Sequence, residues 1–113
     1  MLASYLHSTD FDLFQTAIQA SAQIEGFQTI INLSRSVLGQ TGVGHFCPVG
    51  GYNVETRKVL LLDTARFKYP PHWVDIELLY ASICEKRGDG EPRGFICLAR
   101  KATPIERKTL PPA

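Results

Sequence analysis

The amino-acid sequence predicts a small α+β domain with an antiparallel sheet and two flanking helices. Two segments place apolar residues at helical spacing, and four shorter runs have the composition of strands. The chain has 113 residues, no internal repeats and no linker long enough to separate two domains. We therefore expect one folded unit over residues 1–100 and a disordered tail over residues 101–113, which contain three prolines.

Two helices are predicted. The first begins after the capping residues Ser8-Thr9-Asp10 and ends before Gly26. Its apolar positions at helical spacing are Phe11, Phe14, Ile18 and Ala22. The second is expected over residues 73–85, and its buried face is predicted to contain Ile76, Leu79, Tyr80 and Ile83. We also expect Trp73 to lie in the core, and His72 to be a surface or packing residue.

Strands are predicted on both sides of the second helix. Apolar residues alternate along residues 27–35, so Arg35 is expected at a strand end, before a turn over residues 39–42. The last strand is expected over residues 94–100, after a charged loop. Residues 66–72 contain Pro70-Pro71, which excludes both strand and helix interior, so this segment is predicted to be irregular.

A β-hairpin is predicted in the middle of the chain. Residues 43–51 and 58–65 are short apolar runs, and the polar residues 53–57 form the loop between them. One face is expected to contain Cys47, Val49, Val59 and Leu61, and the other Phe46, Pro48, Leu60 and Leu62. Because both faces are apolar, we expect the hairpin to be buried within a larger sheet.

The register of this hairpin decides whether two polar side chains meet. If the loop is centred on Val54, His45 lies directly opposite Asp63 on the same face. A bulge at Gly50-Gly51 would shift this register. An imidazole held by a carboxylate is how enzymes orient a general base. The alternatives are a histidine satisfied by a backbone carbonyl and an aspartate that caps the following turn.

Composition excludes several function classes. The chain is 44% hydrophobic and 20% charged, with a net charge of +1, and no basic cluster contains stacking aromatics, so we expect no nucleic-acid partner. The longest apolar run is too short to cross a bilayer, and the N-terminus does not resemble a signal peptide. The three cysteines show no disulfide pattern. These features predict a cytoplasmic protein that is not associated with membranes.

The hairpin and the segment after it carry a family resemblance. The motifs are Gly39-Gln40-Thr41-Gly42, Gly44-His45-Phe46, Pro48, Gly50-Gly51-Tyr52 and the run Asp63 to Val74. They closely resemble phytochelatin synthase, and the resemblance extends from about Ser8 to Arg100. It implies that the chain is the strand-rich half of a papain-like cysteine peptidase fold, in a family of enzymes that act on glutathione. A cysteine attacks the γ-Glu-Cys acyl group, glycine leaves, and the acyl group passes to glutathione or a growing phytochelatin peptide.

The resemblance also implies roles for individual residues. His45 matches the family's catalytic histidine and Asp63 its catalytic aspartate, while Arg66 and Arg35 match arginines implicated in substrate binding or activity. No organic cofactor is implied. Heavy-metal ions, cadmium and zinc among them, are implied as activators or as part of a metal-glutathione thiolate substrate, in the context of metal detoxification.

One part of the family's site has no counterpart in this sequence. No cysteine precedes His45, whereas the family's nucleophile lies upstream in a helical lobe. We therefore expect the chain alone to be inactive and to need that lobe as a partner. A truncated gene model, a split gene or a nucleophile-less glutathione-binding scaffold would each explain the pattern. Without the lobe, the apolar face around Val43, Cys47 and Leu61 is expected to be exposed.

Cys47 could be a substitute nucleophile, a metal ligand or an inert thiol. It lies about 7 Å from His45 along one strand face, which is too far for a nucleophile-base hydrogen bond. The middle of a strand also provides no electropositive environment to stabilise a thiolate. A zinc site made of His45, Cys47, Cys84 and Cys97 would lack a recognisable ligand spacing. We therefore predict a buried, inert thiol.

Overall fold

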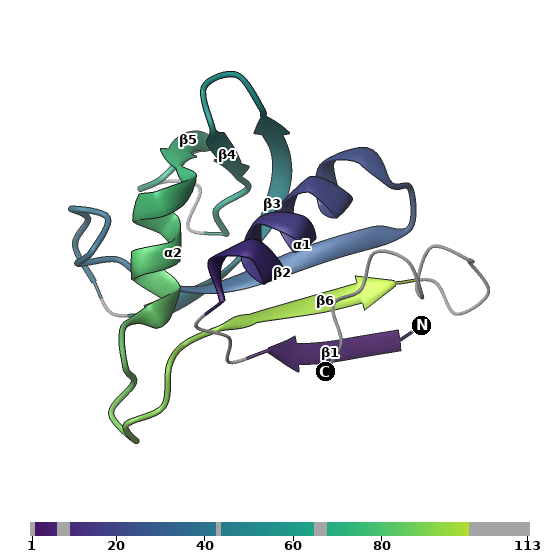
Figure 1. The fold of residues 1–113 in the computed structure, drawn as a ribbon. Helices are drawn as coiled ribbons and strands as arrows, with labels where there is room; N and C mark the ends of the chain where they lie inside the picture. The colour runs from purple at the N-terminus through teal and green to yellow at the C-terminus, as the bar shows by residue number, and fades with distance from the viewer. Residues whose placement is uncertain (1, 7–9, 43, 65–67, 100–113) are drawn as a thin grey trace.

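A six-stranded antiparallel sheet forms the framework of the protein (Figure 1). The computed structural model describes residues 2–6, 10–42, 44–64 and 68–99. Its elements are β1 (Leu2–Leu6), α1 (Phe11–Gln23), β2 (Phe27–Ser34), β3 (Gly44–Asn53), β4 (Lys58–Leu61), β5 (His72–Asp75), α2 (Ile76–Cys84) and β6 (Phe95–Ala99). The strand order is β1-β6-β2-β3-β4-β5. The predicted α+β class with an antiparallel sheet and two helices is confirmed.

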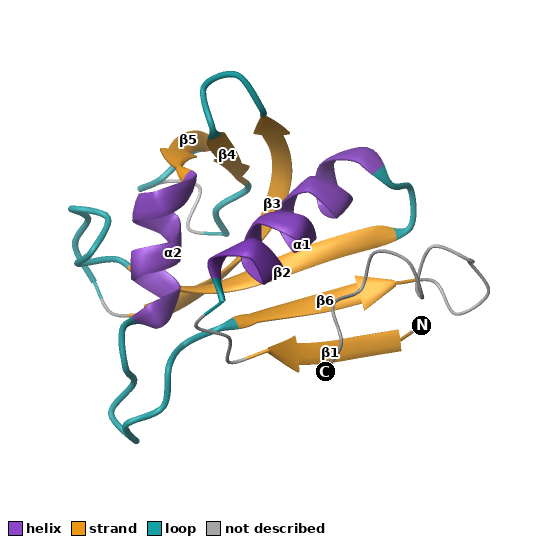
Figure 2. Ribbon diagram, in the orientation of Figure 1, coloured by secondary structure: helices purple, strands orange, loops and turns teal. Residues whose placement is uncertain are grey.

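Both helices pack on the same face of the sheet and enclose the core (Figure 2). The ring of Tyr80 in α2 contacts Phe11 and Phe14 of α1, with ring centroids 5.2 and 5.7 Å apart. Phe14 in turn contacts Phe95 of β6 at 5.4 Å. Aromatic contacts of this kind stabilise a core beyond the burial of area alone. They fix the two helices against each other and against the centre of the sheet.

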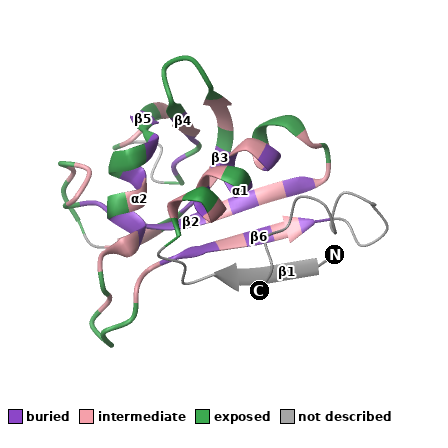
Figure 3. Ribbon diagram, viewed as in Figure 1, coloured by how far each residue is buried: buried purple, intermediate pink, exposed green. Residues whose placement is uncertain are grey.

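The exposed apolar residues around the hairpin lie on the face of the sheet opposite the one that was predicted to be exposed. Cys47 and Leu61 are fully buried, so the expectation that their face is exposed is wrong; Val43, the third residue of that face, lies outside the described residues. Figure 3 shows buried stretches of β2 beneath the helices. Phe46, Leu62 and Trp73 are exposed instead. Side chains alternate between the two faces of a strand, so these three lie on the side of the sheet opposite the helices. The hairpin is therefore buried on one face only, and the predicted core position of Trp73 is wrong.

Helix boundaries follow from side-chain caps. The Asp10 carboxylate accepts hydrogen bonds from the backbone N–H groups of Asp12 and Leu13, which fixes the start of α1 as predicted. Asp75 caps α2 in the same way, so this helix begins three residues later than predicted. The cap and the three residues before it form β5, which pairs with β4. A four-residue edge strand is too short to show a periodic pattern, and neither β5 nor β1 was predicted.

The hairpin has a different register from the predicted one. The Asn53 side chain accepts hydrogen bonds from two N–H groups of the loop, and Asn53 pairs with Lys58. This pairing already differs from the predicted one at the loop. A bulge between Val49 and Gly51 then shifts the register by one residue, and beyond it Val49 lies opposite Leu61, where Val59 was predicted. The predicted bulge is confirmed, and the predicted pairing is wrong. Among the described residues, no helix is long and apolar enough to cross a membrane.

Candidate active site

A buried ion pair joins Asp63 and Arg35. Arg35 directly follows β2, as predicted, and Asp63 lies two residues beyond the end of β4. The two guanidinium Nη atoms donate to the two carboxylate oxygens of Asp63 at 2.9 and 2.8 Å, and the side chains are 6% and 0% exposed. The hydrogen bond to Asp63 raises the pKa of Arg35. Because both Nη atoms of the planar guanidinium donate to it, the Asp63 carboxylate is fixed in position and orientation.

His45 lies close to this pair but has a different partner. It pairs with Leu33 across β2 and β3, and its Nε2 atom hydrogen-bonds the hydroxyl of Thr64, the residue after Asp63. The Val49–Leu61 register, continued by the hydrogen bond from Leu62 N to Pro48 O, brings Asp63 opposite Cys47. The predicted pairing of His45 with Asp63 across the hairpin is therefore wrong. The connection between them is instead Thr64, which follows Asp63 in sequence and hydrogen-bonds His45.

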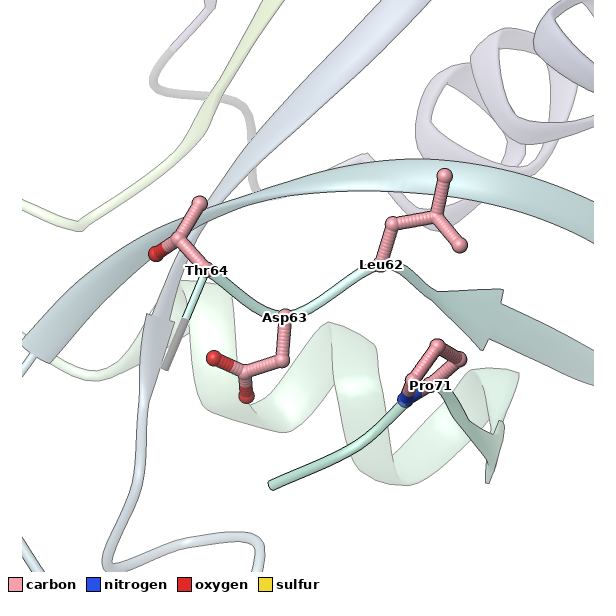
Figure 4. A pocket seen from close by; sticks show the side chains of 4 residues that line it. All are labelled: Leu62, Asp63, Thr64 and Pro71. Carbon is pink, nitrogen blue, oxygen red and sulfur yellow. The ribbon is translucent and has the colours of Figure 1, made fainter. Parts of the chain in front are cut away.

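A pocket opens beside Asp63. It has a volume of about 470 Å³ and is lined by Leu62, Asp63, Thr64 and Pro71. Figure 4 shows the Leu62 and Thr64 side chains on one side of the backbone and the Asp63 carboxylate on the other. Pockets of this size hold small organic ligands. An ordered carboxylate at its wall, with an imidazole bonded to the next residue, suits proton transfer and charge stabilisation.

The thiols in this region are poorly suited to attack a substrate. Burial and, to a smaller extent, the nearby Asp63 charge raise the pKa of Cys47 to about 12, although the charge of Arg35 acts in the opposite direction. Burial also raises the pKa of Cys97 to about 11. Both thiols are therefore neutral at physiological pH, as an inert role for Cys47 requires. Over the described ranges, no three His, Cys, Asp or Glu side chains are grouped so that they could hold a metal ion.

We expect native Cys47 and Cys97 to resist alkylation by iodoacetamide near pH 8, because only a thiolate reacts and both thiols are buried and neutral. Peptide mass spectrometry after a timed reaction measures the modified fraction at each cysteine. The same protein in urea serves as the control and should be labelled at all three cysteines. Rapid labelling of Cys47 in the folded chain would show that it is an activated thiol.

Sequence reasoning missed two residues of the site and placed one outside the described part. Thr64, the partner of His45, has no recognisable signal in the sequence. Gln40 was noted only as part of a turn, although its side chain hydrogen-bonds Arg35. Polar residues in turns usually bond their own backbone, so such long-range roles are hidden in sequence. Arg66, predicted to bind substrate, lies outside the described residues.

Comparison with known proteins agrees with the motifs. The phytochelatin synthase family model matches residues 2–95. The glutathione gamma-glutamylcysteinyltransferase of Schizosaccharomyces pombe is 44% identical over 96 residues, which are 84% of this chain and 23% of that protein. Glutathione gamma-glutamylcysteinyltransferase 1 of Arabidopsis thaliana is 42% identical over 90 residues, which are 79% of this chain and 19% of that protein. The chain thus spans about a fifth of the length of these relatives. With a family model matched along most of its length, the chain belongs to the phytochelatin synthase family.

Proposed function

We propose that this chain is the base-bearing part of a glutathione γ-glutamylcysteinyltransferase, a papain-like domain over residues 1–100 that works with a separate nucleophile-bearing lobe. The observation that carries the proposal is the buried Asp63 carboxylate at the wall of a pocket, next in sequence to the residue that binds His45. The identity to named transferases supports the same activity. The substrates are glutathione and phytochelatin peptides.

The reaction has two acyl-transfer steps. The nucleophile thiol loses its proton to His45 and attacks the cysteinyl carbonyl carbon of glutathione. The bond from this carbon to the glycine nitrogen breaks, and His45 returns the proton to the leaving amine. The α-amino group of a second glutathione or of a phytochelatin then attacks the thioester. His45 takes the amine proton and returns it to the departing thiolate, which restores the enzyme.

Asp63 stabilises the positive charge that forms on His45 in both steps. Its charge is buried, and a buried carboxylate without a partner is costly, so Arg35 keeps it ionised and in place. The Thr64 hydroxyl bonds Nε2 of His45 and keeps the ring close to the pocket. When the nucleophile-bearing lobe is in place, the ring turns toward the thiol, and the Asp63 carboxylate orients its other nitrogen.

The two arginines have different parts in this proposal. Arg66 binds a glutathione carboxylate, which its planar fork fits well. Arg35 was predicted beside it as a substrate-binding residue, but its side chain is buried and engaged with Asp63. In this proposal Arg35 affects the substrate only indirectly, by holding the Asp63 carboxylate in place. Cadmium and zinc take part as thiolate complexes of glutathione, the substrate form, so the described residues need not provide a resident metal site.

A chimera tests the proposal. Residues 2–95 of this chain would replace the corresponding segment of the Schizosaccharomyces pombe relative, and glycine release and phytochelatin formation would be measured with glutathione and cadmium. We expect transfer by the chimera and no turnover by the 113-residue chain alone, because a base without a nucleophile retains little of a covalent mechanism. In the chimera, Cys47→Ser should be nearly silent. A folded chimera that binds glutathione without transfer would favour the scaffold alternative.

A further inference from the structure

We propose that Gln40 and His72 are positioning residues that hold the Arg35–Asp63 pair in its working geometry. The inference rests on the proposed function, because it takes Asp63 to be the carboxylate that serves His45. Neither residue lines the pocket beside Asp63. Their influence on the reaction passes along a chain of hydrogen bonds that begins at β5 and ends at the carboxylate.

Gln40 holds Arg35 by two separate contacts. Its backbone N–H donates to the backbone carbonyl of Arg35 at 2.8 Å, which closes the turn after β2. Its side-chain Oε1 accepts from Nη1 of Arg35, also at 2.8 Å. Nη1 is the same atom that donates to Oδ2 of Asp63. The position of the Gln40 amide thus sets the direction of the guanidinium fork, and with it the position of the carboxylate.

The direction of every bond in this chain is determined at both ends. An arginine can only donate, so the Gln40 amide must turn its oxygen to Arg35 and its NH₂ group to His72. Nε2 of His72, 3.2 Å from the amide nitrogen, must then accept. Nδ1 of His72 lies 2.7 Å from the carbonyl oxygen of Pro70, which can only accept, so Nδ1 carries the proton. Both ends select the same neutral tautomer of His72.

Surrounding contacts hold the chain rigid. The Arg35 guanidinium lies 4.5 Å from the ring centroid of Tyr69, and the Tyr69 hydroxyl accepts from the backbone N–H of Thr41 at 2.9 Å. Tyr69, in the segment before β5, therefore contacts the turn after β2 at two points, the Arg35 guanidinium and the Thr41 backbone. His72 itself pairs with Leu61 at the end of β4, two residues before Asp63. The pairing of β4 with β5 thus connects the His72 end of the hydrogen-bond chain to its Asp63 end.

The tautomer of His72 tests this arrangement without any activity measurement. In the full 113-residue chain with ¹⁵N-labelled histidine, long-range ¹H–¹⁵N spectra should show a protonated Nδ1 and an acceptor Nε2 at His72. Gln40→Glu keeps an oxygen for Arg35 but turns a second one to Nε2, so Nε2 of His72 should change from an acceptor to a donor and its ¹⁵N signal should move. Gln15→Leu, which removes a glutamine amide from α1, should leave the His72 signals unchanged. A proton on Nε2 in the wild type, or an unchanged spectrum in Gln40→Glu, would overturn the proposal.

The effect on catalysis is measured in the chimera. Gln40→Leu and His72→Phe should each lower kcat by about 10- to 100-fold and change KM by less than about threefold, since they displace a catalytic group and leave the pocket intact. Gln15→Leu should keep the parent kcat. If His45→Ala lowers kcat and Gln40→Leu does not, the positioning role is wrong and the proposed function stands. If the His72 signals are as expected but His45→Ala has no effect, the proposed function is wrong.

Discussion

Replacing His45 with alanine is expected to lower γ-Glu-Cys transfer by the chimera about a thousandfold or more. His45 handles a proton in both acyl-transfer steps of the proposed reaction, and the members of such a catalytic unit depend on one another. The His45 side chain is only half-buried, and among the described residues its hydrogen-bond partner is the hydroxyl of Thr64. The fold should therefore be retained when this side chain is removed. Initial rates of glycine release at saturating glutathione and cadmium measure the loss.

The matched control for this variant is Cys47→Ser, two residues away on the same strand face. It changes a buried thiol that the proposed mechanism does not use, so its rate should stay close to that of the parent chimera. Circular dichroism of both variants shows whether the fold is kept. Equal loss of activity in the two variants, or an active His45→Ala, would remove His45 from the mechanism.

Breaking the Arg35–Asp63 pair is expected to have the largest effect on stability. Arg35→Met leaves the buried Asp63 charge without the fork that binds both its oxygens, and such a loss costs about 3–5 kcal/mol. Small domains are stable by only about 5–15 kcal/mol, so the variant should be close to unfolding. Urea denaturation of the 113-residue chain, followed by circular dichroism, gives the change in the free energy of unfolding.

Further variants test whether the loss of stability comes from burial of an uncompensated charge. Arg57→Met breaks an ion pair with Glu77 at 3.5 Å whose side chains are 47% and 69% exposed, so it should cost at most about 1 kcal/mol. The double variant Arg35→Met/Asp63→Leu removes both buried charges and should be more stable than Arg35→Met alone. Asp63→Leu completes the cycle, and a double variant whose loss equals the sum of the Arg35→Met and Asp63→Leu losses would show that the pair is not coupled.

Local signals were sufficient to predict most of the fold. The Asp10 cap, the helical spacing of the apolar residues of α1 and the alternation along β2 are each contained in a few neighbouring residues, and the structure agrees with them. The edge strands β1 and β5 were missed because their existence depends on pairing with distant strands. The start of α2 was placed too early for the same reason, since β5 takes the residues before its cap.

The candidate site was predicted in part. The motifs pointed to His45, Asp63 and Arg35, and the structure places Arg35 on Asp63. The register between β3 and β4 failed because the loop residues and a bulge, both sensitive to a shift of one residue, decide which side chains face each other. Two-sided burial was also wrong, since Phe46 and Leu62 have the composition of a core but lie on the open face of the sheet.

In the proposed function, this chain supplies the base and another part of the enzyme supplies the nucleophile. The most direct test is peptide mapping by mass spectrometry after brief exposure to glutathione and cadmium, followed by an acid quench to trap the acyl-enzyme. We expect a γ-Glu-Cys acyl group on a cysteine of the yeast-derived part of the chimera and none on Cys47, Cys84 or Cys97, with no adduct on the 113-residue chain alone. An acyl group on Cys47, in either protein, would show that this chain supplies the nucleophile itself.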